Sequence, residues 1–182
     1  MEVSSHSLEK ERVAGINFEI GVLTNLTPEH LDFHGNMDRY YASKKKLFSK
    51  SKKAVICADD FYTVKMFREC DIPKCSCSVR NTEADYYADE IKYNGIEGIS
   101  FELVCKRGRE NIVSSLPGEF SVSNTLTAAA VLSELGCSLP EAAKGLALTE
   151  GVKGRMEQVK TGKDFSVIID YAHTPDALAK VL

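Results

Sequence analysis

The sequence contains no apolar run approaching the ~20 residues that a membrane-spanning helix needs, so a membrane-embedded protein is not expected. Met1 is followed at once by charged and polar residues and not by the apolar segment of a signal peptide, which predicts a cytoplasmic location. No CxxC pair occurs among the six cysteines, so we expect reduced residues that serve packing. A zinc site at Cys75 and Cys77 is the weaker alternative.

The sequence also lacks a GxxxxGKS or GxxxxGKT phosphate-binding loop, an internal repeat and a low-complexity tract. Its 182 residues, 43% hydrophobic content and net charge of −3 suit one or two globular units with a substantial core. Nothing in this balance indicates a nucleic-acid-binding protein.

The most informative stretch runs from Asn25 to Phe48. After a turn at residues 34–36, apolar side chains recur at helical spacing and predict one buried stripe on a helix; they are Met37, Tyr40, Tyr41, Leu47 and Phe48.

Lys44 falls in the middle of this stripe, whereas Lys45 and Lys46 point elsewhere on the helix. Burial and two neighbouring cations both favour the neutral amine of Lys44. A neutral amine can capture carbon dioxide and give a carbamate, an anion able to hold a divalent cation. The alternative, favoured by periodicity alone, is a lysine that extends along Tyr40 and Leu47 to water.

His30 and His34 are four residues apart, which on a helix would place both rings on one face and suggest a metal site. Gly35 follows closely, however, and the segment is typical of a loop that enters a helix. Two surface histidines are therefore an equal alternative.

Strand and helix patterns alternate and predict an α/β fold with a mostly parallel sheet. An antiparallel hairpin region is expected over residues 75–116, because short alternating strands are separated by glycine-containing turns. The expected strands are residues 1–5, 18–26, 54–58, 156–160 and 165–172, and the expected helices are residues 8–15, 37–48, 61–70, 121–135, 139–148 with Pro140 in its first turn, and 175–182.

Several sequence blocks follow one another from end to end of the chain: MEVSSHSLEKERV from Met1, NLTPEHLDFHG from Asn25, the lysine at Lys44, GRMEQV from Gly154 and DYAHTPDAL from Asp170. Together they resemble the Mur ligases, and among these the MurE type. Enzymes of that type use ATP to add the third amino acid, diaminopimelate or lysine, to UDP-N-acetylmuramoyl-L-alanyl-D-glutamate in peptidoglycan precursor synthesis.

The resemblance implies that residues 1–151 form the later part of a central ATPase domain, without its phosphate-loop part. Residues 152–182 would begin a Rossmann-like C-terminal domain, after a linker at residues 149–155. An ATP-using enzyme needs backbone amides and a lysine around the phosphates, so catalysis by this chain alone is not expected.

The resemblance also implies a site chemistry, in which a substrate carboxylate is phosphorylated by ATP and the incoming amine attacks the acyl phosphate. Glu2, His30 and a carbamate on Lys44 match the family's ligands for two Mg²⁺ ions. Magnesium prefers oxygen, which a carbamate would supply. For Glu2 a solvated acid is the alternative, and for His34 a capping or hydrogen-bonding role is sufficient.

Ser4, Lys10 and Arg12 match positions that contact the UDP-muramoyl-dipeptide, and the planar fork of an arginine suits a carboxylate or a phosphate. Arg12 could equally be a cation at the end of a helix. The implied nucleotide contacts are Asn124, Arg155, Asp170 and His173. Asp170 as a turn acid, and Ser121 as a helix N-cap, are the structural alternatives.

Other functions remain open at this point. The chain could bind a nucleotide or a nucleotide-sugar without turnover, which the missing phosphate loop favours. It could also resemble the ligase that adds the next dipeptide or a folylpolyglutamate synthetase, and DYAHTPDAL argues against both. The sequence does not distinguish diaminopimelate from lysine. Neither a nucleic-acid partner nor a membrane partner is expected.

Overall fold

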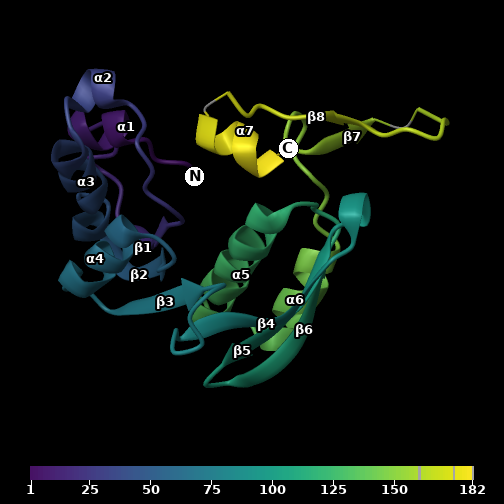
Figure 1. The fold of residues 1–182 in the computed structure, drawn as a ribbon. Coiled ribbons are helices and arrows are strands. Elements are labelled where there is room, and N and C mark those ends of the chain that lie inside the picture. Colours follow the sequence, from purple (N-terminus) through teal and green to yellow (C-terminus); the bar gives the residue numbers. More distant parts are fainter. Residues whose placement is uncertain (160, 174, 182) are drawn as a thin grey trace. The chain divides into compact units, whose positions relative to one another are not determined.

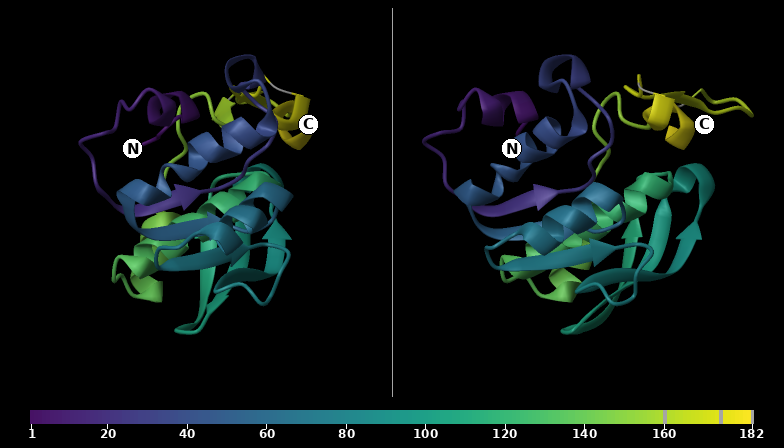
Figure 2. Two further views of the ribbon diagram at one scale, coloured as in Figure 1. Left: turned by 90° about the vertical axis from the view of Figure 1, so that its left-hand side faces the viewer. Right: turned by 60° about the vertical axis from the view of Figure 1, so that its left-hand side comes forward.

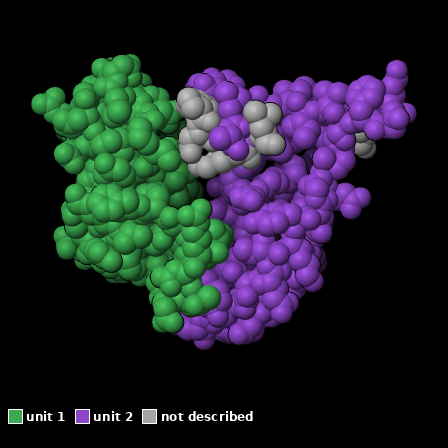
Figure 3. All heavy atoms as spheres, viewed as in Figure 1, with its two compact units in different colours: residues 1–85 green, residues 86–182 purple. Residues whose placement is uncertain are grey.

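The structure is a computed structural model that describes residues 1–159, 161–173 and 175–181 (Figure 1). It divides into two compact units, Met1–Asp85 and Tyr86–Leu182, which Figure 3 distinguishes by colour. Each unit is described on its own.

The first unit is a parallel sheet with helices. Strands β1, β2 and β3 lie side by side in that order, and Gly21 pairs with Ala54 while Ile56 pairs with Ser76. The elements are α1 (Ser5–Glu9), β1 (Phe18–Leu23), α2 (Leu31–His34), α3 (Met37–Lys45), η1 (Phe48–Lys50), β2 (Ser51–Cys57), α4 (Phe61–Glu69) and β3 (Lys74–Ser78).

The core of this unit forms where β2 is apolar on both faces. Ala54–Cys57 are all buried, as expected for a strand inside a parallel sheet. The aromatic stripe of α3 packs into the same cluster through Tyr40 and Tyr41. Helix α4 begins at a capping box in which Asp60 and Thr63 satisfy each other's backbone N–H groups.

Three predictions for this unit are wrong. Residues 1–5 were expected to be a strand and residues 8–15 a helix, but α1 begins at Ser5 and ends at Glu9. The cause is a cap, because the hydroxyl oxygen of Ser4 accepts the backbone N–H of Ser7 at 3.1 Å and starts the helix early. Strand β3 was assigned to the antiparallel region, but it pairs parallel to β2, and its residues Cys75–Ser78 are all buried.

The second unit begins with an antiparallel meander. β4 (Tyr86–Tyr93), β5 (Ile99–Cys105) and β6 (Gly108–Ser114) pair in sequence order, with the short η2 (Gly95–Glu97) between the first two. Helices α5 (Glu119–Glu134) and α6 (Leu139–Ala147) pack on this sheet (Figure 2). The hairpin region predicted from the glycine turns is therefore confirmed for β4–β6.

The remaining elements are β7 (Glu157–Val159), which pairs antiparallel with β8 (Val167–Ile169), and α7 (Pro175–Val181). Lys160, Thr174 and Leu182, which belong to the predicted strand, motif and helix here, lie outside the described residues. The α/β class is confirmed, with parallel pairing in β1–β3 and antiparallel pairing in β4–β6.

The helix ends of the second unit follow local chemistry. Ser121 is not an N-cap, because α5 already begins at Glu119 after Gly118, and the Ser121 hydroxyl donates to the carbonyl of Pro117 at 2.6 Å. Pro140 lies in the first turn of α6, as predicted. Four of the six cysteines are buried, as expected for packing residues; they are Cys57, Cys70, Cys75 and Cys77. Within the described ranges, no helix is long and apolar enough to cross a membrane.

Candidate functional site

Lys44 lies on α3, a helix that starts where the side chain of Asn36 accepts the backbone N–H of Arg39 at 3.0 Å. Its amine is partly buried, and this burial lowers the pKa of Lys44 below its usual value. The carboxylates of Glu2 and Glu29 act in the opposite direction, so both lie within electrostatic range of the amine. The pairing of Glu2 with Lys44 in one metal site stays a prediction.

The two neighbouring lysines are solvated and paired elsewhere. The Lys45 ammonium is 2.9 Å from the Glu69 carboxylate, and the Lys46 ammonium is 2.6 Å from the Glu9 carboxylate. Burial is thus the main cause of the low pKa of Lys44.

His30 and His34 have different surroundings. His30 is the residue before α2, in a left-handed conformation with φ 56°, and its Nε2 is 3.8 Å from a Glu29 carboxylate oxygen. His34 is only 5% exposed, and its Nε2 is hydrogen-bonded to the Ser5 hydroxyl at 2.8 Å. The hydrogen-bonding role predicted for His34 is confirmed.

A third histidine joins them that the sequence reasoning missed. The ring centroid of His6 is 5.0 Å from that of His30, 5.6 Å from that of His34 and 4.0 Å from that of Phe33. The signal was available in the SSH sequence, because His6 lies only four residues after the predicted metal ligand Glu2.

A metal site built from unmodified side chains is not preformed. Among residues 1–159, 161–173 and 175–181, no three His, Cys, Asp or Glu side chains are grouped as metal ligands would be, which includes the cysteines of β3. The set Glu2, His30 and Lys44 fits Mg²⁺ only if Lys44 carries a carbamate, because magnesium prefers oxygen ligands. A partly buried amine of lowered pKa is the group that such a modification requires. The metal set stays a prediction.

The residues matched to the muramoyl-dipeptide lie on or after α1. Ser4 caps α1 and is hydrogen-bonded to the Ser7 hydroxyl at 2.9 Å, so its side chain already has a structural role. Lys10 is exposed, with its ammonium 5.5 Å from the ring centroid of Phe33. Arg12 is exposed and lies beyond the end of α1 at Glu9. Their substrate contacts stay predictions.

The residues matched to the nucleotide belong to the second unit. Asn124 is exposed on α5. The Arg155 guanidinium lies 4.9 Å from the centroid of the Tyr171 ring, and Nδ1 of His173 is 2.9 Å from the Tyr171 carbonyl oxygen. Asp170 accepts two backbone N–H groups, from Met156 at 2.8 Å and from Ala172 at 2.7 Å. Asp170 is thus a turn acid in this structure, and its nucleotide role stays a prediction.

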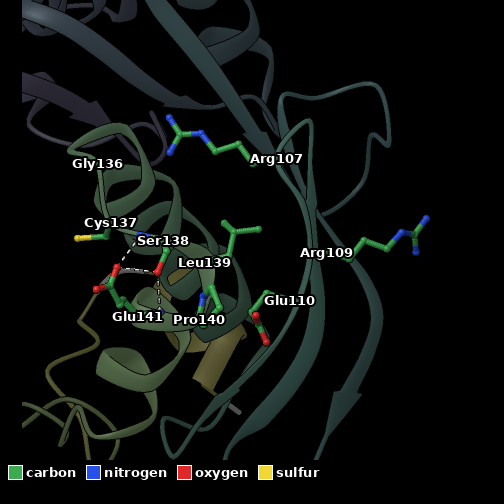
Figure 4. A pocket seen from close by; sticks show the side chains of 9 residues that line it. All are labelled: Arg107, Arg109, Glu110, Gly136, Cys137, Ser138, Leu139, Pro140 and Glu141. Carbon is green, nitrogen blue, oxygen red and sulfur yellow. Dashed lines mark hydrogen bonds between the residues drawn. The ribbon is translucent and has the colours of Figure 1, made fainter.

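The second unit also has an open hollow of about 490 Å³ beside the start of α6 (Figure 4). Its polar groups serve local structure: the Arg107 guanidinium donates to the Ser133 carbonyl at 2.6 Å, and Ser138 and Glu141 form a capping box. No residue predicted for the site lines this hollow. The lining residues are Arg107, Arg109, Glu110, Gly136, Cys137, Ser138, Leu139, Pro140 and Glu141.

Comparison with known proteins adds to this geometry. A family model described as the Mur ligase middle domain matches residues 1–132. The UDP-N-acetylmuramoyl-L-alanyl-D-glutamate--2,6-diaminopimelate ligase of Clostridioides difficile (strain 630) is 44% identical over 186 residues, covering 100% of this chain and 38% of the relative. The ligase of the same name from Streptomyces coelicolor is 39% identical over 185 residues, covering 100% of this chain and 37% of its own length.

Two solved structures of ligases are similar to this chain. One of a UDP-N-acetylmuramoyl-L-alanyl-D-glutamate--2,6-diaminopimelate ligase has a TM-score of 0.83 at 33% identity, over 99% of this chain and 38% of that one. The MurF ligase of Thermotoga maritima in complex with ADP has a TM-score of 0.78 at 19% identity, over 98% of this chain and 41% of that one, which shows a shared fold. The chain spans about 38% of the length of the curated relatives that it matches.

Proposed function

This chain belongs to the Mur ligase family, and we propose that it contributes to an ATP-dependent ligase that adds the third amino acid to UDP-N-acetylmuramoyl-L-alanyl-D-glutamate. The observation that carries the proposal is the 44% identity, over the whole chain, to a ligase named for that substrate and for diaminopimelate. Because the sequence has no phosphate-binding loop of its own, the activity is proposed for a polypeptide that carries both this chain and such a loop. ATP as the energy source favours a cytoplasmic reaction.

Lys44 supplies the first chemical step. Its neutral amine attacks the carbon of carbon dioxide; the C–N bond forms as one C–O π pair moves onto oxygen, and the nitrogen then releases a proton to water. The product is a carbamate anion with two hard oxygens. The lowered pKa of Lys44 supports this step, because it increases the fraction of neutral amine.

Glu2, His30 and the Lys44 carbamate would then hold Mg²⁺. When bound, the metal offsets phosphate charge as a Lewis acid and aligns the reacting groups. The position of Glu29 beside His30, with its carboxylate oxygen 3.8 Å from the imidazole Nε2, supports a net negative lining here.

The other matched residues hold the two substrates. We assign Ser4, Lys10 and Arg12 to the UDP-muramoyl-dipeptide, where Arg12 can engage a carboxylate or phosphate with two parallel hydrogen bonds. We assign nucleotide binding to Asn124, Arg155, Asp170 and His173. ATP transfers its terminal phosphoryl group to the substrate carboxylate. The amine of the incoming amino acid then attacks the acyl phosphate and displaces the phosphate.

We place the family's domain boundary at residues 151 and 152, with the central domain before it and the start of the C-terminal domain after it. The segment 149–156 supports this placement, because no helix or strand occupies it. The two compact units divide the chain at a different point, between Asp85 and Tyr86.

The test is an ADP-release assay on the full-length ligase that carries this chain, supplied with the UDP-muramoyl-dipeptide and with either diaminopimelate or lysine. We expect ADP release that depends on one of the two amino acids, and the preferred one identifies the third residue of the peptide. Absence of ADP release with both would contradict the proposal.

A second candidate function is ligand binding without turnover, which the missing phosphate loop favours for this chain alone. Isothermal titration of the 182-residue chain with ATP, and separately with the UDP-muramoyl-dipeptide, measures it. Binding of either ligand, combined with no ADP release by the full-length protein, would favour this alternative.

A further inference from the structure

Three buried polar residues form one hydrogen-bonded group, through side chains and one backbone carbonyl, that the proposed chemistry does not use. Nε2 of His34 is 2.8 Å from the Ser5 hydroxyl, and the Ser43 hydroxyl donates to the Ser5 carbonyl at 2.9 Å. His34 is 5% exposed, and Ser5 and Ser43 are each 1% exposed. We call Ser5, His34 and Ser43 the serine–histidine bridge.

The bridge joins three segments that each carry one residue of the predicted metal set. Ser5 is the first residue of α1 and follows Glu2 closely. His34 is the last residue of α2, which begins just after His30. Ser43 directly precedes Lys44 on α3.

Neither α1 nor α2 can be held in place by its own helical structure. Helix α1 has five residues and α2 has four, and isolated helices shorter than about 12 residues are marginal in water. Their placement on α3 must therefore come from tertiary contacts. Buried hydrogen bonds are directional, so they fix orientation as well as distance.

Tyr40 extends the bridge toward the lysine. Its ring stacks on His34 with centroids 5.1 Å apart, and it also faces His30 edge-on at 6.3 Å. Tyr40 is four residues before Lys44, so both side chains project from the same face of α3. The bridge and this ring together connect the histidine-bearing segment with the lysine-bearing helix.

We propose that the serine–histidine bridge is a positioning device: it holds the segments that carry Glu2, His30 and Lys44 in the arrangement that carbamate formation and cation binding require. This inference rests on the proposed function, since the carbamate is part of that proposal. The bridge residues touch neither substrate nor cation. They act through the placement of the three segments.

The bridge acts on the carbamate through the placement of α1 and α2 on α3. Displacing either helix from α3 would move the segment that carries Glu2 or His30 relative to Lys44, so the carbamate would lose the surroundings that hold it. A weakened bridge should therefore raise the bicarbonate concentration that half-saturates the modification.

The test uses ¹³C-bicarbonate and NMR detection of the Lys44 carbamate carbon in the full-length ligase that carries this chain, with the signal assigned by its loss in Lys44→Ala. Ser43→Ala is the main variant, because it removes the hydroxyl that donates to the Ser5 carbonyl and adds no bulk. The matched control is Ser49→Ala, since the Ser49 hydroxyl makes the same kind of bond, to the Lys46 carbonyl at 2.8 Å, on the exposed surface.

We expect Ser43→Ala to raise the half-saturating bicarbonate concentration about fivefold, equivalent to the ~1 kcal/mol of one hydrogen bond, and saturating bicarbonate to restore the full signal. Ser49→Ala should match the unsubstituted protein. His34→Gln, which retains a donor and an acceptor, is the second variant and should shift the concentration in the same direction.

The possible failures are distinct. Equal bicarbonate dependence in the unsubstituted protein, Ser43→Ala and His34→Gln would overturn the positioning role and leave the carbamate intact. A shift in Ser49→Ala as large as that in Ser43→Ala would also overturn it, because the effect would then be unspecific. Complete lack of a carbamate signal in the unsubstituted protein would overturn the carbamate assignment itself, and the inference with it.

Discussion

The imidazole of His34 stacks on the phenol ring of Tyr40, with centroids 5.1 Å apart and planes inclined by 25°. This contact joins the end of α2 to the face of α3 from which Lys44 projects. Lys44 therefore projects from the helix face that carries Tyr40, which stacks on the hydrogen-bonded His34, and not from an open helix surface. The proposed carbamate chemistry depends on that setting.

Truncation of Tyr40 should destabilise the 182-residue chain. The side chain is 5% exposed and belongs to the apolar core of the first unit, so Tyr40→Ala should lower the free energy of unfolding by about 3 kcal/mol. Urea denaturation measures the change. Tyr93→Ala is the matched control, because Tyr93 is 54% exposed, and its expected effect is below about 0.5 kcal/mol. Equal losses in the two variants would contradict the packing described for Tyr40.

The stability of the chain should fall in mild acid because of His34. Burial is the largest cause that lowers the pKa of His34 below its usual 6.5. Positive charge on His6 and His30 also lowers this pKa, whereas the carboxylates of Glu9 and Asp32 raise it. The folded state thus binds fewer protons at this residue than the unfolded state does. The associated stability is present above pH 6.5 and is lost as the pH falls through the folded-state pKa.

His34→Gln should remove this pH dependence, which urea unfolding between pH 7.5 and about pH 5 would detect as a flatter profile. His173→Gln is the control, because the His173 ring is exposed, and it should retain the acid loss of the unsubstituted chain. If His34→Gln and His173→Gln gave the same profile as the unsubstituted chain, burial of His34 would not account for the acid sensitivity.

Much of the fold could be predicted from the sequence where local pattern and tertiary packing agree. The buried strand at Ala54–Cys57, the helix that carries Lys44 and the proline-containing start of α6 all follow from hydrophobic period and capping chemistry. The lowered pKa of Lys44 also followed, because a lysine on an apolar face must lose hydration.

The sequence pattern does not predict several features that involve small polar residues. The alternating Cys and Ser of β3 resemble the short alternating strands of the hairpin region, but both kinds of residue are small, and Cys75–Ser78 are all buried in a strand that pairs parallel to β2. Ser4 was matched to a substrate, and its capping of α1 was overlooked. The approach of His6 to His30 depends on how α1 packs beside the residue that precedes α2, which no periodicity encodes.

Substitution by alanine should change the free energy of unfolding in opposite directions at two glycines. Gly98 has φ 110° and ψ −148°, a region open essentially to glycine alone, and an added Cβ would lie 2.0 Å from the Ser114 carbonyl oxygen. Gly98→Ala should therefore cost more than about 3 kcal/mol of unfolding free energy. Gly145 lies inside α6 with no atom within 4 Å of an added Cβ, so Gly145→Ala should add about 0.5–1 kcal/mol. Thermal unfolding of both variants checks the pair, and destabilisation by Gly145→Ala would contradict the open space described around it.

Asp170 should control the local opening of the backbone where the chain enters β7 and where it leaves β8. Its two carboxylate oxygens accept the N–H groups of Met156 and Ala172, so Asp170→Ala should speed hydrogen exchange of both amides by about tenfold or more, the equivalent of one lost charged hydrogen bond each. Asp164→Ala, at an exposed position of the same region, is the control and should leave both rates unchanged. Unchanged rates in Asp170→Ala would show that these bonds do not hold the segment.

The most direct test of the account is the turnover of Lys44→Ala in the full-length ligase that carries this chain, measured with and without acetate. We expect a loss of activity of at least about 100-fold, the scale expected when a metal-positioning group is removed, with partial recovery in acetate because its carboxylate replaces the carbamate oxygens. Lys46→Ala is the control: its exposed pair with Glu9 is screened by solvent, so the substitution should leave turnover unchanged. Full activity in Lys44→Ala would contradict the assignment of a carbamate to this lysine.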